Sequence, residues 1–227
     1  AIVVEGPTYR YTVDRASGTI TGLETKEDGL VRLRQPADVW FDRTPLSECT
    51  GGTTDVVTQG RDQVILSTRG ALRERAPYTL ETTFYNDGVV VCAMTVSPAA
   101  DFALTEGIRF EVSAEGQFSH YLHKRRDSEG IDSFQGALPE GGQTVGLATL
   151  TSCLEVFSHE AALAIFTDRG GTYRQPADAP LASLTVTESG SGNASVGLTQ
   201  HIVRAEPDGE PFVVPAGESF TFRTGLA

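Results

Sequence analysis

Hydrophobic and polar residues alternate along most of the chain with a period of two, the pattern of strands that bury one face. In "TYRYTV" (8–13), Tyr9, Tyr11 and Val13 fall on one side. The following "DRASG" (14–18) combines Asp, Ser and Gly, which favours a tight turn. The same alternation predicts further strands at 19–24, 38–42, 55–59, 63–68, 108–113, 153–158, 162–167, 184–188, 194–203 and 219–224.

One hairpin is signalled more clearly than the others. The segments "YTLETTFY" and "VVVCAMTV" flank "NDG" (86–88), a sequence that suits a tight two-strand turn. The best helix candidate is "VFSHEAALAIF" (156–166), for which we favour two strands joined by a bend at His159 and Glu160. Short strands without helical spacers predict an all-β fold, a large antiparallel two-sheet β-sandwich with little or no helix.

The chain is expected to form a single domain over 1–227. Two segments rich in Gly, at 138–143 and 188–195, are too short to be domain linkers and are interpreted as loops. The length of 227 residues is enough to bury a sizeable core.

Composition excludes some partners. The formal net charge of -12 argues against nucleic acid and against anionic membrane surfaces, which both require a basic footprint. No apolar run approaches the length of a membrane-spanning helix. The chain begins at Ala1 instead of Met, which we interpret as a processed start, and we therefore expect a secreted or periplasmic protein.

The cysteines and the acidic residues give few signs of a cofactor. Three widely spaced cysteines are not a disulfide framework, although one bridge among Cys49, Cys92 and Cys153 stays open. "HEAAL" (159–163) lacks the second His of a zinc-binding helix. We expect no cofactor. A less specific alternative is calcium bound by the acidic residues of "DSEGIDS", namely Asp127, Glu129 and Asp132.

The segment "HYLHKRR" (120–126) concentrates basic residues on an acidic chain. If it forms a strand, Tyr121 and His123 project from one face, next to Arg125. A Tyr or His beside an Arg suits an acidic sugar, because Arg binds the uronate carboxylate while the other group transfers a proton. Tyr121 and His123 are thus candidate catalytic residues of a lyase, with Lys124, Arg125 and Arg126 binding substrate. The alternative is a solvated basic strand end.

Other residues are candidates for stacking on sugar rings or binding their polar groups. They are Trp40, the only tryptophan, and the pair Tyr173 and Arg174 in "GGTYRQP". A lone Trp among strand residues is also typical of a core position. His201 in "LTQHIV" is interpreted as a half-buried strand residue.

Three segments carry a resemblance to a known family. They are "YRYTVDRASGTITGLE" (9–24), "EVFSHEAALAIFTDRGGTYRQP" (155–176) and "PFVVPAGESFTFRTGLA" (211–227). Together they resemble the N-terminal β-supersandwich (galactose mutarotase-like) domain of glycoside hydrolase family 123-type proteins. The resemblance implies that the catalytic carboxylates lie on a following barrel domain, which we expect after Ala227. It therefore assigns no catalytic residue within this chain.

Three functions remain open from the sequence. The first is a carbohydrate-associated module of a glycan-degrading enzyme that binds polysaccharide or oligosaccharide and is joined to a following catalytic domain. The second is a free-standing polysaccharide lyase acting on an acidic, uronate-containing glycan. The third is a structural or interaction domain without a glycan role.

Overall fold

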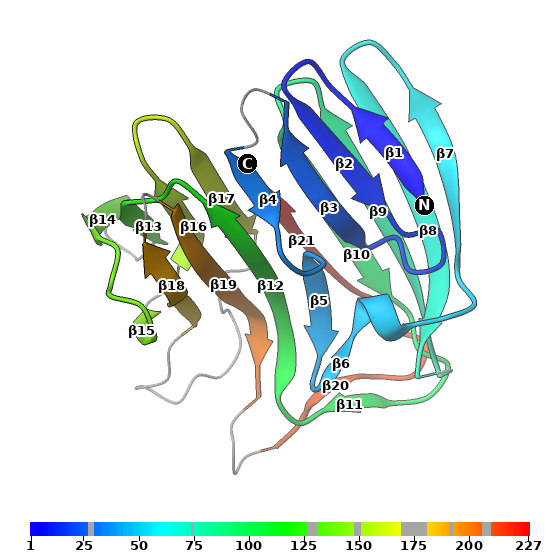
Figure 1. Ribbon diagram of the computed structural model, residues 1–227. Helices are drawn as coiled ribbons and strands as arrows, with labels where there is room; N and C mark the ends of the chain where they lie inside the picture. The colour runs from blue at the N-terminus through cyan, green and yellow to red at the C-terminus, as the bar shows by residue number, and fades with distance from the viewer. Residues whose placement is uncertain are drawn as a thin grey trace.

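Two large antiparallel sheets lie face to face and form a β-sandwich (Figure 1). The computed structural model describes residues 1–26, 30–73, 75–126, 131–147, 151–168, 181–190, 193–205 and 210–227. For residues 125, 126, 131, 132, 151, 152 and 190 it describes the backbone alone. Among the described residues the only helical element is a single 3-10 turn, Leu46–Glu48. The all-β prediction is confirmed.

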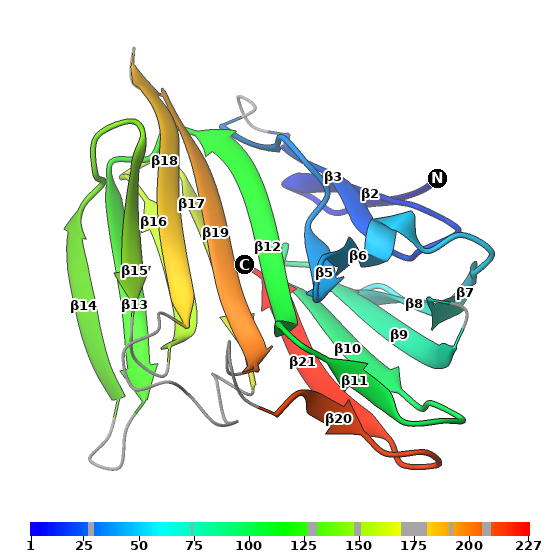
Figure 2. The same cartoon turned by 90° about the horizontal axis from the view of Figure 1, so that it is seen from below.

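The first sheet has ten strands. Its main path runs in the order β1-β2-β3-β4-β12-β19-β18-β15, and β5 and β6 join it beside β12. Figure 2 shows β12 and β19 as long, curved neighbours near its middle. The strand bounds are β1 Ile2–Glu5, β2 Tyr9–Val13, β3 Ile20–Thr25, β4 Val31–Leu33, β5 Asp38–Phe41, β6 Thr44–Pro45, β12 Gly107–Gly116, β15 Gln143–Leu147, β18 Ala182–Gly190 and β19 Asn193–Arg204.

The second sheet has nine strands in the order β14-β13-β16-β17-β21-β10-β9-β8-β7, and a separate two-stranded sheet pairs β11 with β20. The bounds are β7 Thr53–Gln59, β8 Gln63–Leu72, β9 Ala76–Tyr85, β10 Val90–Val96, β11 Phe102–Leu104, β13 His120–Arg126, β14 Ile131–Ala137, β16 Thr151–Phe157, β17 Ala162–Thr167, β20 Phe212–Val214 and β21 Phe220–Leu226.

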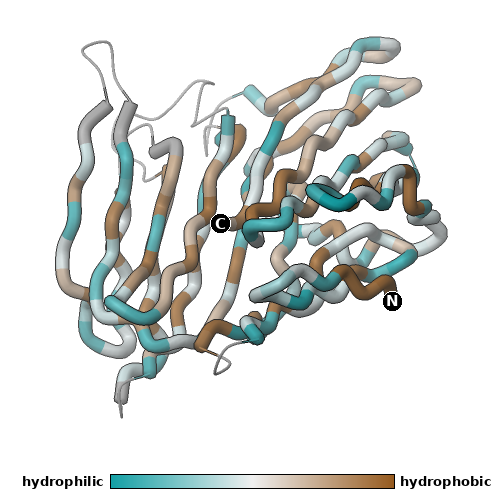
Figure 3. The backbone as a smooth tube through the Cα atoms, turned by 90° about the horizontal axis from the view of Figure 1, so that it is seen from above, coloured by the Kyte–Doolittle hydropathy of each residue, from teal (hydrophilic) through white to brown (hydrophobic). Residues whose placement is uncertain are grey.

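The core lies between the two large sheets, where the inward residues of each strand meet. Its largest fully buried side chains include Phe84, Phe110 and Phe222. Figure 3 shows hydrophobic and hydrophilic residues alternating along many of the strands. Burial of alternate side chains is what the period-two pattern predicts, because successive residues of a strand point to opposite faces.

The predicted turn at 14–18 is confirmed, and its side chains explain it. The Asp14 carboxylate accepts hydrogen bonds from the Ala16 and Ser17 backbone N–H groups at 2.9 and 2.8 Å. These bonds, led by that of Ser17, hold the pKa of Asp14 below its ordinary value. Gly18 adopts a positive φ of 75°, a conformation that glycine tolerates without strain.

Other local predictions are also resolved. The 156–166 segment forms the end of β16 and the start of β17, so the two-strand interpretation is confirmed. Cys49, Cys92 and Cys153 are all free thiols, and burial raises the pKa of Cys92 to about 11. No helix in the described residues has the length and apolar character needed to span a membrane.

We predict that Gly225→Ala destabilises the fold. A methyl group at Gly225, in β21 between β10 and β17, meets the Val90 carbonyl oxygen and the Phe166 ring. Because backbone in a packed sheet cannot move freely, the free energy of unfolding falls by about 2–3 kcal/mol. Urea denaturation measures it.

Gly22→Ala is the matched control, since its methyl group lies 3.4 Å from the nearest atoms of Thr12. Its stability changes by about 0.5 kcal/mol or less. Equal effects of the two substitutions contradict the packing described for Gly225.

Candidate functional site

A row of chemically active side chains crosses the outer face of the ten-stranded sheet. Trp40 on β5 pairs with Arg109 on β12, and Arg109 pairs with His201 on β19. The register of β12 and β19 shifts between Ile108 and Arg109. This irregularity leaves both Ile202 and Val203 buried while Arg109 and His201 sit side by side, and such bulges often re-aim side chains at functional sites.

Arg109 is fixed in place by three contacts. Its Nε donates to Glu111 Oε1 at 2.6 Å and its Nη1 donates to the Asp42 carbonyl oxygen at 2.5 Å. Its guanidinium lies 4.8 Å from the centre of the Trp40 ring, a cation–π contact. His201 lies beside it in the register. Arg109 therefore orients the indole of Trp40 and neutralises Glu111.

A groove of about 480 Å³ opens next to this row on the same face. Trp40 and Asp38 line one side of it, and Glu111 and Thr199 come from the neighbouring strands β12 and β19. Gly197 leaves open space in the groove, since a methyl group added there would meet no atom closer than 3.9 Å. The remaining lining residues are Gln35, Pro36, Pro45, Ser47, Glu48, Val112, Ser113, Thr185, Thr187 and Leu198.

The carboxylate of Asp38 lines this groove but is almost completely buried. Asp38 is only 4% exposed, and its two oxygens lie 3.2 and 3.3 Å from the Ser47 backbone nitrogen that donates to them. Burial raises its pKa to about 6, and the hydrogen bonds from Ser47 oppose this only in part. Asp38 therefore changes charge near neutral pH, as general acids and bases do.

His201 is half-buried, as the sequence predicted. Burial, and then the charges of Arg204 and Arg109, lower its pKa to about 4. Its Nδ1 is buried and has no hydrogen-bond partner among the described residues. The imidazole is consequently neutral at physiological pH, and its Nδ1 is able to accept a hydrogen bond.

Tyr121 and His123 lie together on β13, but they face the inside of the sandwich. Their cross-strand neighbours on β16 are Val156 and Leu154, which are both fully buried. Tyr121 packs against the core, and the His123 ring stacks on Phe134 of β14 at 4.9 Å. This pair therefore belongs to the other sheet and does not share a site with Trp40.

The remaining predicted residues are placed only in part. Lys124 lies on β13 with an exposed side chain, and of Arg125 and Arg126 only the strand backbone is described. Tyr173, Arg174, Asp127 and Glu129 lie outside the described residues, as does the side chain of Asp132. Within the described part of the chain no cluster of three or more His, Cys, Asp or Glu side chains is arranged to hold a metal ion.

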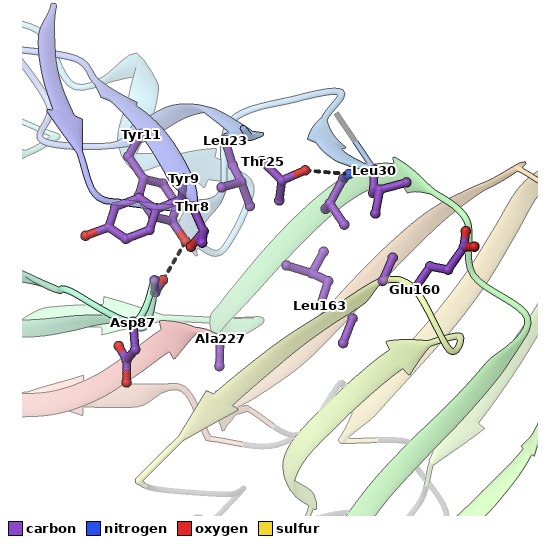
Figure 4. A pocket seen from close by; sticks show the side chains of 14 residues that line it. Thr8, Tyr9, Tyr11, Leu23, Thr25, Leu30, Asp87, Glu160, Leu163 and Ala227 are labelled. Carbon is purple, nitrogen blue, oxygen red and sulfur yellow. Dashed lines mark hydrogen bonds between the residues drawn. The ribbon is translucent and has the colours of Figure 1, made fainter. Parts of the chain in front are cut away.

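A second cavity, of about 270 Å³, lies at one end of the sandwich between the two sheets (Figure 4). Tyr11 and Leu23 line one side of it, while Leu163 and Ala227 line the other. The Tyr9 and Tyr11 hydroxyls already donate to the Tyr85 and Gly88 carbonyl oxygens at 2.6 and 2.9 Å. This mostly apolar cavity offers fewer polar groups than the groove beside Trp40.

Asp38, Arg109 and Glu111 were missed by the sequence interpretation. Strand alternation places Asp38 on the face of Trp40, and it places Glu111 on the face of Arg109. The signal was therefore present within each strand. What the sequence did not show is that β5, β12 and β19 are neighbours. In the chain, 66 residues lie between Trp40 in β5 and the start of β12 at Gly107, and β19 follows later still.

Solved structures identify the fold. A galactose mutarotase-like protein from Lactobacillus casei ATCC 334 superposes with a TM-score of 0.55 at 13% identity, over 99% of this chain and 98% of that one. A putative aldose 1-epimerase from Escherichia coli K12 gives 0.52 at 12% identity, over 99% and 97%. At such identities the likeness shows only that this chain shares the fold of these proteins. No family model and no curated protein matches the sequence.

Two longer proteins contain the same fold as one part. The α-N-acetylgalactosaminidase NagBb from Bifidobacterium bifidum has a TM-score of 0.56 at 9% identity, and the match covers 100% of this chain but 36% of that one. A heparan sulfate lyase, HepC, from Pedobacter heparinus has a TM-score of 0.50 at 8% identity, over 96% and 32%. The fold therefore occurs both as nearly whole proteins and as a portion of larger ones.

We predict that Asp38→Asn alters the pH dependence of stability. The folded state raises the pKa of Asp38 from 3.8 to about 6, so the stability that its proton contributes is present below pH 3.8 and lost as the pH rises to about 6. The Asn side chain does not ionise. As the pH rises from ~4 to ~7.5, the free energy of unfolding of the variant therefore increases by about 2 kcal/mol relative to that of the native chain. Urea denaturation at both pH values measures this difference.

Asp14→Asn serves as a control of opposite sign. Because the fold lowers the pKa of Asp14, its stabilisation is present at neutral pH and is lost as the pH falls. This variant is therefore less stable than the native chain at neutral pH, and the difference shrinks in acid. A pH-independent effect of Asp38→Asn contradicts the burial argument.

Proposed function

We propose that this chain binds carbohydrate in the groove beside Trp40. The observation that carries the proposal is the position of Trp40, which is half-exposed on the outer face of the sheet and lines a groove rich in hydroxyl and carboxyl groups. Aromatic rings stack on the apolar faces of sugar rings, while carboxylates and hydroxyls bind their OH groups. A groove of about 480 Å³ lies within the range of small-molecule sites.

The fold supports the same proposal by analogy. Several proteins with this fold carry names that refer to sugars, among them a putative aldose 1-epimerase and an α-N-acetylgalactosaminidase. One fold can support many functions, and the residues of the site determine which one. The main support for the proposal is therefore the groove, and not the similarity to solved structures. We further propose that the chain is a secreted or periplasmic module next to a catalytic domain, as in glycoside hydrolase family 123-type proteins.

Trp40→Ala is expected to weaken glycan binding at least tenfold, which corresponds to about 1.4 kcal/mol. The reason is the loss of the stacking surface. Calorimetry with neutral oligosaccharides such as cellohexaose, xylohexaose and chitohexaose measures the effect. Gly197→Val gives the same loss by a different route, because its side chain projects into the groove and removes no polar group.

Phe134→Ala is the matched control, since Phe134 is a 43% exposed aromatic on the other sheet. It leaves binding unchanged if the groove is the site. If Phe134→Ala loses glycan binding while Trp40→Ala binds as tightly as the native chain, the site lies on β13 and β14 instead. Absence of binding to every glycan overturns the proposal.

A second candidate is a lyase on acidic polysaccharide, and the state of His123 favours it. Burial lowers the pKa of His123, and its Nδ1 has no hydrogen-bond partner among the described residues. A neutral imidazole two residues from Tyr121, on the same face of β13, is a candidate base for proton abstraction beside a uronate.

We predict that, if this candidate is correct, incubation with heparan sulfate, alginate or polygalacturonate produces unsaturated sugars that absorb in the ultraviolet. His123→Ala and Tyr121→Phe then lower the rate by at least about 100-fold, because each removes a proton-transferring group. Trp40→Ala is the control and leaves the rate unchanged. The lyase candidate is rejected if the native chain releases no such product from any of these polysaccharides.

A further inference from the structure

The charges that line the groove beside Trp40 are of one sign. Asp38, Glu48 and Glu111 contribute three carboxyl groups, and the described residues that line it include no Lys or Arg. Arg109 lies next to Glu111 and compensates that one carboxylate at 2.6 Å. Asp38 and Glu48 are left to give the groove a negative potential on a chain that is itself acidic.

Asp38 lacks a cationic partner within the part of the chain that the structure describes. Its contacts are hydrogen bonds from the Ser47 side chain and from backbone N–H groups, and burial keeps its pKa raised. A buried carboxylate of this kind is stabilised when a positive charge comes within a few ångströms, because the opposite charge favours the ionised form. A ligand with an ammonium group supplies that charge, whereas a neutral sugar does not.

The arginines near the groove are already engaged with protein groups. Arg109 contacts Glu111, the Asp42 carbonyl and Trp40. Arg34, which precedes the lining residue Gln35, donates to Ser195 at 2.7 Å and to Glu188 at 3.3 Å. Binding a uronate carboxylate there requires breaking these contacts as well as overcoming the repulsion from Asp38 and Glu48. Acidic glycans therefore do not suit this groove.

From these charges we propose that the groove selects glycans that carry free amino groups, such as glucosamine-containing oligosaccharides, over neutral and acidic ones. This inference rests on the proposed carbohydrate binding and names its ligand class. The sugar ring stacks on Trp40, and the ammonium group faces Asp38 with Glu48 nearby. Glu111, held by Arg109, accepts hydrogen bonds from hydroxyl groups without adding net charge.

The test compares three hexasaccharides by calorimetry at pH about 7 with the whole chain. A glucosamine hexamer carries amino groups, chitohexaose has the same backbone with neutral N-acetyl groups, and a galacturonate hexamer is acidic. We expect the glucosamine hexamer to bind at least about tenfold more tightly than chitohexaose, and the galacturonate hexamer to bind more weakly than either. Raising the salt concentration reduces the difference in affinity between the glucosamine hexamer and chitohexaose, because salt screens the attraction between ammonium and carboxylate groups.

Two variants separate charge from shape. Asp38→Asn and Glu48→Gln keep the side-chain volume, and each lowers affinity for the glucosamine hexamer about threefold to tenfold more than it lowers affinity for chitohexaose.

The outcomes distinguish the two proposals. If chitohexaose binds as tightly as the glucosamine hexamer, and Trp40→Ala weakens both, the groove binds glycans but the selection for amino groups is wrong. If none of the hexamers or neutral glycans binds, the proposed function itself fails. If the preference for glucosamine survives in the double variant of Asp38→Asn and Glu48→Gln, the preference arises elsewhere and the inference is overturned.

Discussion

Asp42 holds together the part of the sheet on which the groove is built. It sits at the turn after β5 with a positive φ of 54°, and its carboxylate accepts hydrogen bonds from the Glu106 and Gly107 N–H groups while also pairing with Arg73. Its carbonyl oxygen binds Arg109. One residue thus joins the end of β5 to the start of β12. A non-glycine residue in this conformation is uncommon, and Asp is among the types that tolerate it.

The register between β12 and β19 positions the outward side chains of the neighbouring strands. The irregularity next to Arg109 brings His201 level with Arg109 and Trp40, and beyond it Glu111 pairs with Thr199 and Ser113 with Gly197. Because side-chain direction alternates, a slip of one residue turns all of these groups inward. The buried faces of Phe110 and Leu198 make such a slip costly, since it exposes core side chains. The core thereby specifies the polar outer face.

Much of the fold, but little of the site, could be predicted from the sequence. The strand 162–167 was predicted at its observed bounds, and the Asp14 turn was recognised, because both depend on local alternation and turn chemistry. Short or exposed strands such as β4 and β15 were missed, since three residues, or five without regular alternation, give no period to detect. Trp40 was a candidate from the sequence. Its partners Asp38 and Arg109 were not, because their proximity depends on strand order.

The two faces of the sandwich explain how a ligand site is compatible with a stable fold. Inward residues such as Val112 and Val196 are constrained by packing, whereas outward ones meet only solvent and each other. Asp38 is an exception, because it is on the outer face but is buried beneath the turn that contains Ser47. Burying a carboxylate at this position costs more free energy than burying an apolar side chain. The ionised form of Asp38 costs stability at neutral pH, and a positive charge bound within a few ångströms would offset that cost.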